Sequence, residues 1–292
     1  MEHFRSPDAA ARALLDAAAA MDKARLNAIF GPDGADVISS GDEVADKASA
    51  DRFVAASKEK RTIVDVSPEN ALLEVGNDDW AFPIPIVKTS AGWCFDTAAG
   101  KDELVNRRIG KNEIHTVNAC LSYVDAQRDY ANRMRTARGT TEYAQKIRST
   151  PGRRDGLYWE VRTGERDSPL GPLFADASGE GYAAEASDSG PQPFHGYLFR
   201  VLSAQGVSAP GGKKNYLRGA HMNDGFALAA YPAEYGNSGV MTFVVNRLGV
   251  VFQKDLGQTT GEITAAMKEY NPDATWDPVE PVALLETPTA TE

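Results

Sequence analysis

The sequence contains no apolar run that approaches the ~20 residues a helix needs to cross a bilayer, so we expect no transmembrane segment in it. Basic residues are outnumbered: 31 Lys and Arg against 41 Asp and Glu give a formal net charge of −10. Since like charges repel, neither nucleic acid nor an anionic membrane surface is expected as the main partner. The composition therefore argues against a nucleic-acid-binding protein and against a protein that binds anionic membranes.

Cysteine is equally scarce. Cys94 and Cys120 are the only two, and they show neither metal-ligand spacing nor a CxxC pattern. Two cysteines permit one disulfide, which suits an oxidising compartment, or two buried free thiols. The sequence leaves both alternatives open.

Groups that carry nucleophilic catalysis are few. The four histidines, His3, His115, His195 and His221, lie in neither a nucleophile elbow nor a zincin spacing. His115 falls on an expected helix and is interpreted as a surface or packing residue. The sequence favours a non-catalytic protein without excluding an enzyme.

The first hundred residues predict helices followed by an antiparallel meander. Ser6-Pro7-Asp8 provides an N-cap, a proline at the first helical position and an early acid. Asp22 is expected to cap a second helix, and Asp51–Lys58 to form a third. The short runs TIVDV, ALLEV, WAFPIPIVK and GWCFD then read as strands. Such an α+β layer resembles small cystatin-like cone folds of the nuclear-transport-factor-two type, many of which hold a ligand in the cone.

The second part predicts a long helix packed on an antiparallel sheet. Apolar residues recur at helical spacing from about Lys101 to Met134, and a short helix is expected at Thr141–Ile147. Strand-like runs follow a stretch rich in Gly, Pro and Ser, and residues 261–270 predict a last helix. The predicted organisation is an α+β cone-like domain over 1–100 and a second α+β domain over 101–274. The second domain contains a loop-rich insertion at about 151–193, and a Pro-rich tail covers 275–292.

The second domain resembles the globular head of type IV pilins and pseudopilins. The helix carries Asn-Glu, Ala-Gln and Tyr, and the sheet carries a Pro-x-x-Tyr-Gly-x-x-Gly motif before a Phe-x-x-x-x-x-Gly-Val hairpin. The resemblance implies a structural role for these positions, and the alternating aromatic residues of the first domain predict one for the Trp of its Gly-Trp-x-Phe-Asp motif. They are Trp93, Gln127, Tyr130, Pro232, Tyr235, Gly236, Gly239, Phe243 and Gly249. The prepilin motif and apolar half-helix of pilins are missing, so polymerisation as a pilin is not expected.

Taken together, the motifs FRSPDAAARALLDA, SSGD, FPIPIVK, NRRIGKNE and NPDATWDP are similar to one bacterial family. Its members are exported proteins known only as a domain of unknown function, numbered twenty-nine fifty. The resemblance implies a periplasmic or extracellular location. The family's usual signal peptide is absent from this sequence, as in a mature form. No activity is implied.

The segment GKDELVNRRIGKNE, where the two predicted domains meet, holds the candidate binding residues Arg107, Arg108 and Glu113. Arginine forks pair well with carboxylates, so a structural clamp between the domains is the first interpretation, and an anion-binding site is the alternative.

The acids Asp176, Glu180, Glu185 and Asp188 supply oxygen ligands that calcium accepts. Their spacing matches no calcium loop, so a solvated acidic loop is the preferred interpretation. No cofactor is expected, with calcium as the one exception considered.

Three functional hypotheses follow. The first is a non-catalytic interaction or assembly module of the bacterial envelope with a protein partner. The second is a small-ligand binder that uses the cone of residues 6–100. The third is a hydrolase that uses acids and histidine at the domain junction. The sequence sets neither the partner nor the oligomeric state.

Overall fold

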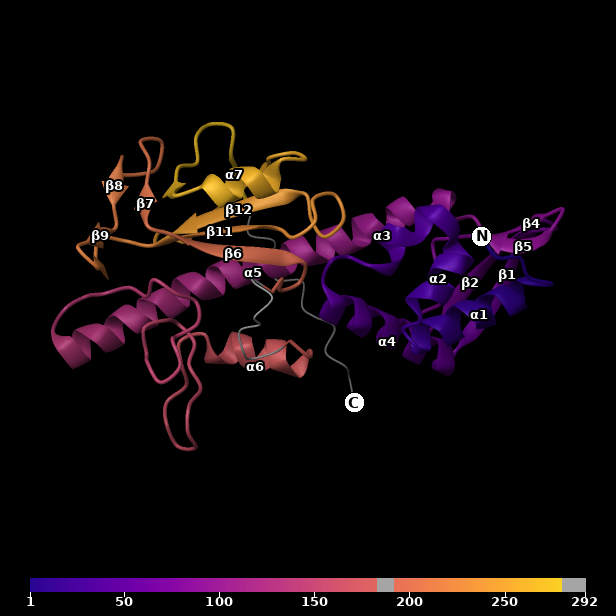
Figure 1. Cartoon of the computed structure of the whole chain (residues 1–292), viewed down its shortest axis with the longest axis horizontal. Coiled ribbons are helices and arrows are strands. Elements are labelled where there is room, and N and C mark those ends of the chain that lie inside the picture. The colour runs from indigo at the N-terminus through magenta and orange to yellow at the C-terminus, as the bar shows by residue number, and fades with distance from the viewer. Residues whose placement is uncertain (183–191, 280–292) are drawn as a thin grey trace.

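The computed structural model of the chain describes residues 1–182 and 192–279 (Figure 1). One helix, α5 (Thr97–Arg138), runs through most of the length of the molecule, and two separate sheets lie against different parts of it. The predicted α+β class is confirmed: N-terminal helices and a small antiparallel sheet come first, and the long helix with a second sheet follows. The domain bounds themselves stay a prediction.

Four α-helices and a 3-10 turn precede the first sheet: α1 (Pro7–Ala19), α2 (Lys23–Phe30), η1 (Gly31–Gly34), α3 (Ala35–Ile38) and α4 (Glu43–Glu59). Ser6 and Asp22 cap α1 and α2 as predicted, each accepting a hydrogen bond from a backbone N–H three residues on. The third expected helix is longer than Asp51–Lys58. It begins after Asp42, whose carboxylate accepts from the Ala45 N–H at 3.0 Å.

The first sheet is an antiparallel meander. It contains β1 (Arg61–Ser67), β2 (Asn70–Val75), β4 (Ile86–Thr89) and β5 (Gly92–Phe95) in that order, with β3 (Trp80–Ala81) on β2. Pro83 and Pro85 lie between β3 and β4, where no ladder donor is needed. Phe82 and Phe95 pack edge to face at 6.1 Å against the N-terminal helices. The runs WAFPIPIVK and GWCFD thus place apolar side chains on the face of the sheet that packs against the N-terminal helices.

The long helix begins earlier and ends later than the predicted bounds of 101 and 134. Asp96 caps it, and Gly139, with a φ of 72°, ends it in the left-handed conformation. Gly100 lies within the helix where the segment between β3 and β4 approaches it: a Cβ at this position would lie 2.3 Å from the Pro83 carbonyl oxygen, so the contact requires glycine.

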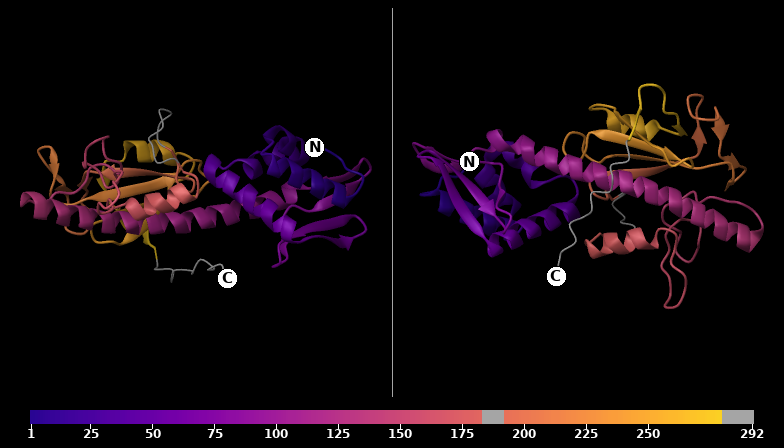
Figure 2. Two further views of the ribbon diagram at one scale, coloured as in Figure 1. Left: turned by 90° about the horizontal axis from the view of Figure 1, so that it is seen from below. Right: turned by 180° about the vertical axis from the view of Figure 1, so that it is seen from behind.

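The second sheet is antiparallel with the order β15-β13-β12-β11-β6. Its strands are β6 (Tyr197–Leu202), β11 (Ala227–Pro232), β12 (Met241–Asn246), β13 (Val251–Asp255) and β15 (Asp277–Pro278). Helix α5 lies on one side of this sheet and α7 (Thr260–Ala266) on the other (Figures 1 and 2). Tyr123 of α5, Phe226 and Phe243 belong to the core that α5 forms with this sheet.

The remaining described elements are short. A three-stranded sheet joins β7 (Ala204–Gln205), β8 (Lys214–Asn215) and β14 (Glu269–Tyr270), and β9 (Leu217–Arg218) pairs with β10 (His221–Met222). The expected helix at 261–270 therefore ends sooner, because its last residues join a strand. The loop-rich stretch contains a helix that was not predicted, α6 (Gly171–Gly179).

The helix predicted at Thr141–Ile147 is wrong. The backbone of Ala144 exchanges two hydrogen bonds with the buried Gln127 side chain, at 2.9 and 2.7 Å, so its polar groups are satisfied without a helix. Tyr143 pairs instead with Met222. Because a side chain of α5 satisfies this backbone, the segment does not need helical hydrogen bonds, although its apolar residues have helical spacing.

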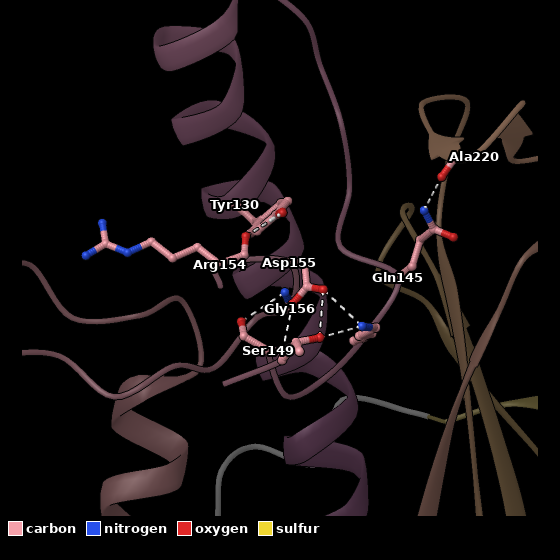
Figure 3. Close-up of polar contacts among 9 residues, drawn as sticks. Tyr130, Gln145, Ser149, Arg154, Asp155, Gly156 and Ala220 are labelled. Atoms are coloured by element: carbon pink, nitrogen blue, oxygen red, sulfur yellow. Dashed lines mark hydrogen bonds and ion pairs between the residues drawn. The ribbon is translucent and has the colours of Figure 1, made fainter. Parts of the chain in front are cut away.

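One further hydrogen bond ties the segment that follows Ala144 to α5, and others close the segment on itself (Figure 3). Tyr130 donates to the Arg154 carbonyl at 3.0 Å, and the Gly156 N–H donates to Ser149 Oγ at 3.0 Å. Asp155 accepts from the side chain of Lys146 and from Thr150, which lowers its pKa to about 2. This irregular but well-bonded segment carries one wall of the cavity described next.

Candidate binding site

A cavity of about 880 Å³ lies between α5, α6 and the β6 edge of the second sheet. Its lining is mainly apolar and comes from distant parts of the chain. The apolar residues are Val44, Ala119, Ile147, Leu170, Leu173, Phe174, Ala177, Pro193, Phe194, Leu198, Phe199 and Leu228. The N-terminal unit reaches this cavity only through the segment from Ser39 to Val44, so the cavity is not the predicted cone of residues 6–100.

A stack of rings stiffens one wall of the cavity. Phe174 of α6 lies parallel to Tyr158, with ring centroids 4.0 Å apart. The Arg148 guanidinium lies over the Phe174 ring at 4.5 Å, and burial lowers the pKa of this arginine. Contacts of this kind position α6 against the segment that follows α5.

Asp42 is the polar centre beside the cavity, and only 2% of it is exposed. Its Oδ2 accepts from the Tyr182 hydroxyl at 2.9 Å and from the Gly196 N–H at 2.9 Å. Its Oδ1 caps α4. Burial, followed by the neighbouring Asp42 charge, raises the pKa of Tyr182 and keeps its hydroxyl protonated as a donor. One carboxylate therefore ties the start of α4 to Tyr182, shortly after α6, and to Gly196, directly before β6.

The backbone is strained where that segment enters β6. His195 has a φ of 48° and Gly196 a φ of 73°. The His195 N–H donates to the Tyr182 hydroxyl oxygen at 3.1 Å. A non-glycine residue in the left-handed region costs about 1–3 kcal/mol and persists where its surroundings fix it. Tyr182 and Asp42 provide those fixing contacts here.

A second, polar pocket of about 520 Å³ adjoins the cavity. The two share Ala119, Leu173 and Phe194 as lining residues. The polar lining consists of His115, Asn118, Ser122, Asp176, Glu180 and His195. The imidazole rings of His115 and His195 are stacked, with centroids 4.1 Å apart and planes within 11° of parallel.

Burial and nearby cations disfavour the charged form of both imidazoles. Burial first, and then His115, Lys111 and Arg52, lower the pKa of His195 to about 3. Burial and the same two cations also lower the pKa of His115. His195 Nε2 lies 3.1 Å from Glu180 Oε2, so the neutral ring carries its proton on Nε2 and donates it to the carboxylate.

The candidate residues Arg107, Arg108 and Glu113 make separate contacts. Arg107 pairs with Glu103 on the exposed side of α5, at 2.7 Å. Arg108 donates to Asn237 Oδ1 at 2.5 Å and to the Val37 carbonyl at 3.3 Å, and burial lowers its pKa. These contacts join α5 to both the N-terminal helices and the turn after β11, as in the clamp interpretation, although the arginine's partner is an amide and not a carboxylate.

Glu113 lies on α5 about one and a half turns beyond Arg108, and its side chain reaches the start of β12. Its Oε1 accepts from the backbone N–H groups of Val240 and Met241, at 3.1 and 3.0 Å. The Tyr197 hydroxyl lies 3.5 Å from the same oxygen, and burial raises the pKa of that tyrosine. The described contacts therefore do not bring Glu113 and the two arginines into one cluster, and a ligand role for the three stays a prediction.

The positions expected to be structural are distributed over both units. Trp93 exchanges backbone hydrogen bonds with Phe4, at 2.7 and 2.8 Å. Pro232 ends β11, and the Tyr235 hydroxyl donates to Asp255 at 3.0 Å. Gly239 lies against the Tyr197 ring, so closely that a Cβ would overlap its hydroxyl. The remaining positions, Gly236, Phe243 and Gly249, lie in the turn after β11, in β12 and in the β12–β13 turn.

Of the four acids considered for calcium, Asp176 and Glu180 line the polar pocket, and Glu185 and Asp188 lie outside the described residues. Within residues 1–182 and 192–279, no group of three His, Cys, Asp or Glu side chains has a geometry that holds a metal ion. Cys94 and Cys120 are both buried free thiols, so the alternative without a disulfide is confirmed.

Sequence reasoning missed the cavity and the role of Asp42. The motif SSGD contains Asp42, and a Ser-Gly-Asp sequence before an Ala-rich run is an N-cap signal. Nothing local in the sequence indicates that Gly196 and Tyr182 donate to the same carboxylate. His195 appeared only as a histidine in a loop.

The chain belongs to a family described as a protein of unknown function, DUF2950, whose model matches residues 1–279. The family inferred from the sequence motifs is thereby confirmed. Neither a curated protein nor a solved structure matches the chain. Among its described helices, none combines the length and the apolar character that crossing a membrane requires.

Proposed function

We propose that this protein is a non-catalytic binding module of the bacterial cell envelope, and that it holds a small, mainly apolar molecule in the cavity beside β6. The observation that carries the proposal is the cavity itself, about 880 Å³ with twelve apolar side chains in its lining. Ligand sites typically occupy about 300–1,000 Å³ and combine an apolar lining with few polar groups. Helix α6 and the Asp42 contacts hold its walls in place without a ligand.

The envelope location is part of the proposal. It is supported by the resemblance to exported proteins, which favours a periplasmic or extracellular site and an envelope protein as a partner. Fractionation of cells that produce the protein from its natural gene tests this. Recovery in the cytoplasm would contradict it.

Binding is tested by titration with the apolar fluorophore N-phenyl-1-naphthylamine. Leu173 is half-buried in α6 and lines both the cavity and the polar pocket, so Leu173→Asp places a charge where the fluorophore lies. We expect saturable binding to the wild type and at least tenfold weaker binding to this variant. Leu121, 40% exposed on α5, is in neither lining, so Leu121→Asp is the matched control and should bind as the wild type does. Absence of saturable binding to the wild type would refute the proposal.

A hydrolase at the junction is the second candidate, and one observation favours it. His195 Nε2 lies 3.1 Å from Glu180 Oε2, the histidine–carboxylate pairing that orients a catalytic imidazole, although a pKa of about 3 makes this ring a weak base at pH 7. The described contacts include no hydrogen bond from either imidazole to a serine, threonine or cysteine side chain. A screen with ester and amide substrates, repeated on His195→Asn, tests this candidate; turnover that the variant loses would support it.

A further inference from the structure

We infer that the polar pocket at His195 receives the head group of the molecule held in the cavity, and that this molecule is a single-chain amphiphile with an uncharged, hydroxyl-bearing head, such as a monoacylglycerol. The inference rests on the proposed function and adds the chemical class of the ligand. It depends on how the two hollows join and on the groups that line the second.

The two hollows lie side by side. Ala119, Leu173 and Phe194 line both, so a molecule in the cavity lies within one side chain of the polar groups in the other hollow. The Phe194 ring lies edge-on to the His195 ring at 4.3 Å, and the apolar lining changes to a polar one at this contact. A molecule that fills the cavity therefore lies close to the imidazole and carboxylate groups beyond Phe194, in addition to polar side chains of the cavity itself such as Asp42 and Arg148.

The polar end offers more acceptors than donors. Asn118 and Ser122 each supply both kinds, and Asp176 supplies acceptors only. The neutral His195 ring donates through Nε2 to Glu180, which leaves its Nδ1 as an acceptor. Hydroxyl groups can donate to these acceptors and accept from Asn118 and Ser122, whereas a group that only accepts can use the latter two alone.

The charges around this end oppose one another. Asp176 and Glu180 are acidic, while the positive charges of Lys111 and Arg52 act on Glu180 and on both imidazoles. An anionic head would lie against the two carboxylates, and a cationic head would lie in the field of the two cations. An uncharged head avoids both penalties.

The pocket is also preorganised. His195 occupies its left-handed conformation because Tyr182 accepts from its N–H and Asp42 accepts from the next N–H along the chain. Strained backbone that is fixed by several contacts is typical of binding sites. The ring stacked on His115 therefore presents its free nitrogen at a set position without a ligand.

The test compares three competitors that share one chain. Monododecanoylglycerol, dodecanoate and dodecyltrimethylammonium, each below its micellar concentration, are titrated against the bound fluorophore. We expect the neutral compound to displace it at a concentration at least tenfold lower than either charged one. Equal potency, or preference for a charged head, would overturn the inference while the proposed function stands. Failure of all three to displace a bound fluorophore would also overturn it, whereas failure of the fluorophore itself to bind would refute the proposed function.

A matched pair of variants then locates the head group. Asn118 is exposed on α5 and lines the polar pocket, and Asn106 is exposed on the same helix outside both linings. Asn118→Leu should lower the affinity for monododecanoylglycerol at least fivefold and leave the affinity for the fluorophore unchanged. Asn106→Leu should change neither affinity. If both variants bind the neutral competitor as the wild type does, the head lies elsewhere and the inference is wrong.

Discussion

The carboxylate of Asp42 accepts a hydrogen bond at 2.9 Å from the N–H of Gly196, a residue 154 positions further along the chain. The contact joins the cap of α4 to the first residue before β6, and it is buried. Because the Tyr182 hydroxyl donates to the same oxygen, this carboxylate fixes the N-terminal unit against the wall of the cavity.

Asp42→Asn should lower the free energy of unfolding by about 1.5–3 kcal/mol, the range for a hydrogen bond to a charged group. The amide still caps α4 through its oxygen, but it cannot accept from both Tyr182 and Gly196 while presenting its NH₂ group. Urea denaturation measures the change. Asp51→Asn, which removes an exposed pair with Lys47, is the control and should cost no more than about 0.5 kcal/mol. Equal stabilities for the two variants would show that the Asp42 contacts do not hold the units together.

Gly196→Ala should destabilise the fold more than Gly139→Ala. Both glycines have nearly the same positive φ, 73° and 72°, so both variants incur the roughly 1–2 kcal/mol cost of a left-handed alanine. A Cβ at Gly139 meets nothing within 4 Å, whereas at Gly196 it lies 2.7 Å from Asn112 Nδ2 and 2.9 Å from Ser238 Cβ. The difference between the two free energies therefore measures crowding alone. A difference near zero would mean that the approach of α5 to this turn is looser than described.

The sequence predicted the regular elements well and the site poorly, for a physical reason. Caps act within three residues, so Ser6 and Asp22 could be recognised locally. The Gln127 side chain satisfies the backbone of Ala144 from 17 residues away, which removed a helix that local spacing favours. The composition of α6, with two glycines, a proline and a serine in nine residues, concealed a helix that packs on an aromatic stack.

The cavity was beyond prediction for the same reason. Its lining is drawn from α4, α5, α6, β6, β11 and several irregular segments, so no single stretch of sequence carries its pattern. His195 could be named as a histidine in a loop, but its backbone conformation depends on Tyr182 and Asp42, which lie 13 and 153 residues away from it.

His195 should make the protein less stable as the pH falls from about 6.5 toward 3. Its pKa is lowered to about 3 in the folded chain from an ordinary 6.5, so between these values the unfolded chain binds a proton that the folded chain does not. The free energy of unfolding then falls by up to about 1.4 kcal/mol per pH unit across that window. Since other groups also titrate there, the measurement is the difference between the wild type and His195→Asn, a residue type that tolerates a left-handed backbone. Parallel pH profiles for the two proteins would contradict the burial of this imidazole.

Neither cysteine should react with a thiol reagent in the folded protein. Cys120 is fully buried, and burial raises its pKa to about 12; burial also raises the pKa of Cys94. Because the thiolate is the reactive form, we expect no labelling by an aromatic disulfide reagent at pH 8 and two equivalents labelled in denaturant. Fewer than two equivalents in denaturant under non-reducing conditions would indicate a disulfide.

The most direct test of the proposed function is to observe the cavity while a ligand binds. Methyl-labelled leucines report on it by nuclear magnetic resonance, since Leu173, Leu198 and Leu228 line the cavity and Leu121 and Leu248 are exposed outside it. On titration with N-phenyl-1-naphthylamine, we expect the methyl signals of the three cavity leucines to shift in a saturable manner and those of the two exposed leucines to stay in place. Shifts confined to the exposed leucines, or no saturable shift at any of the five, would contradict the account of this protein as a binder of small apolar molecules.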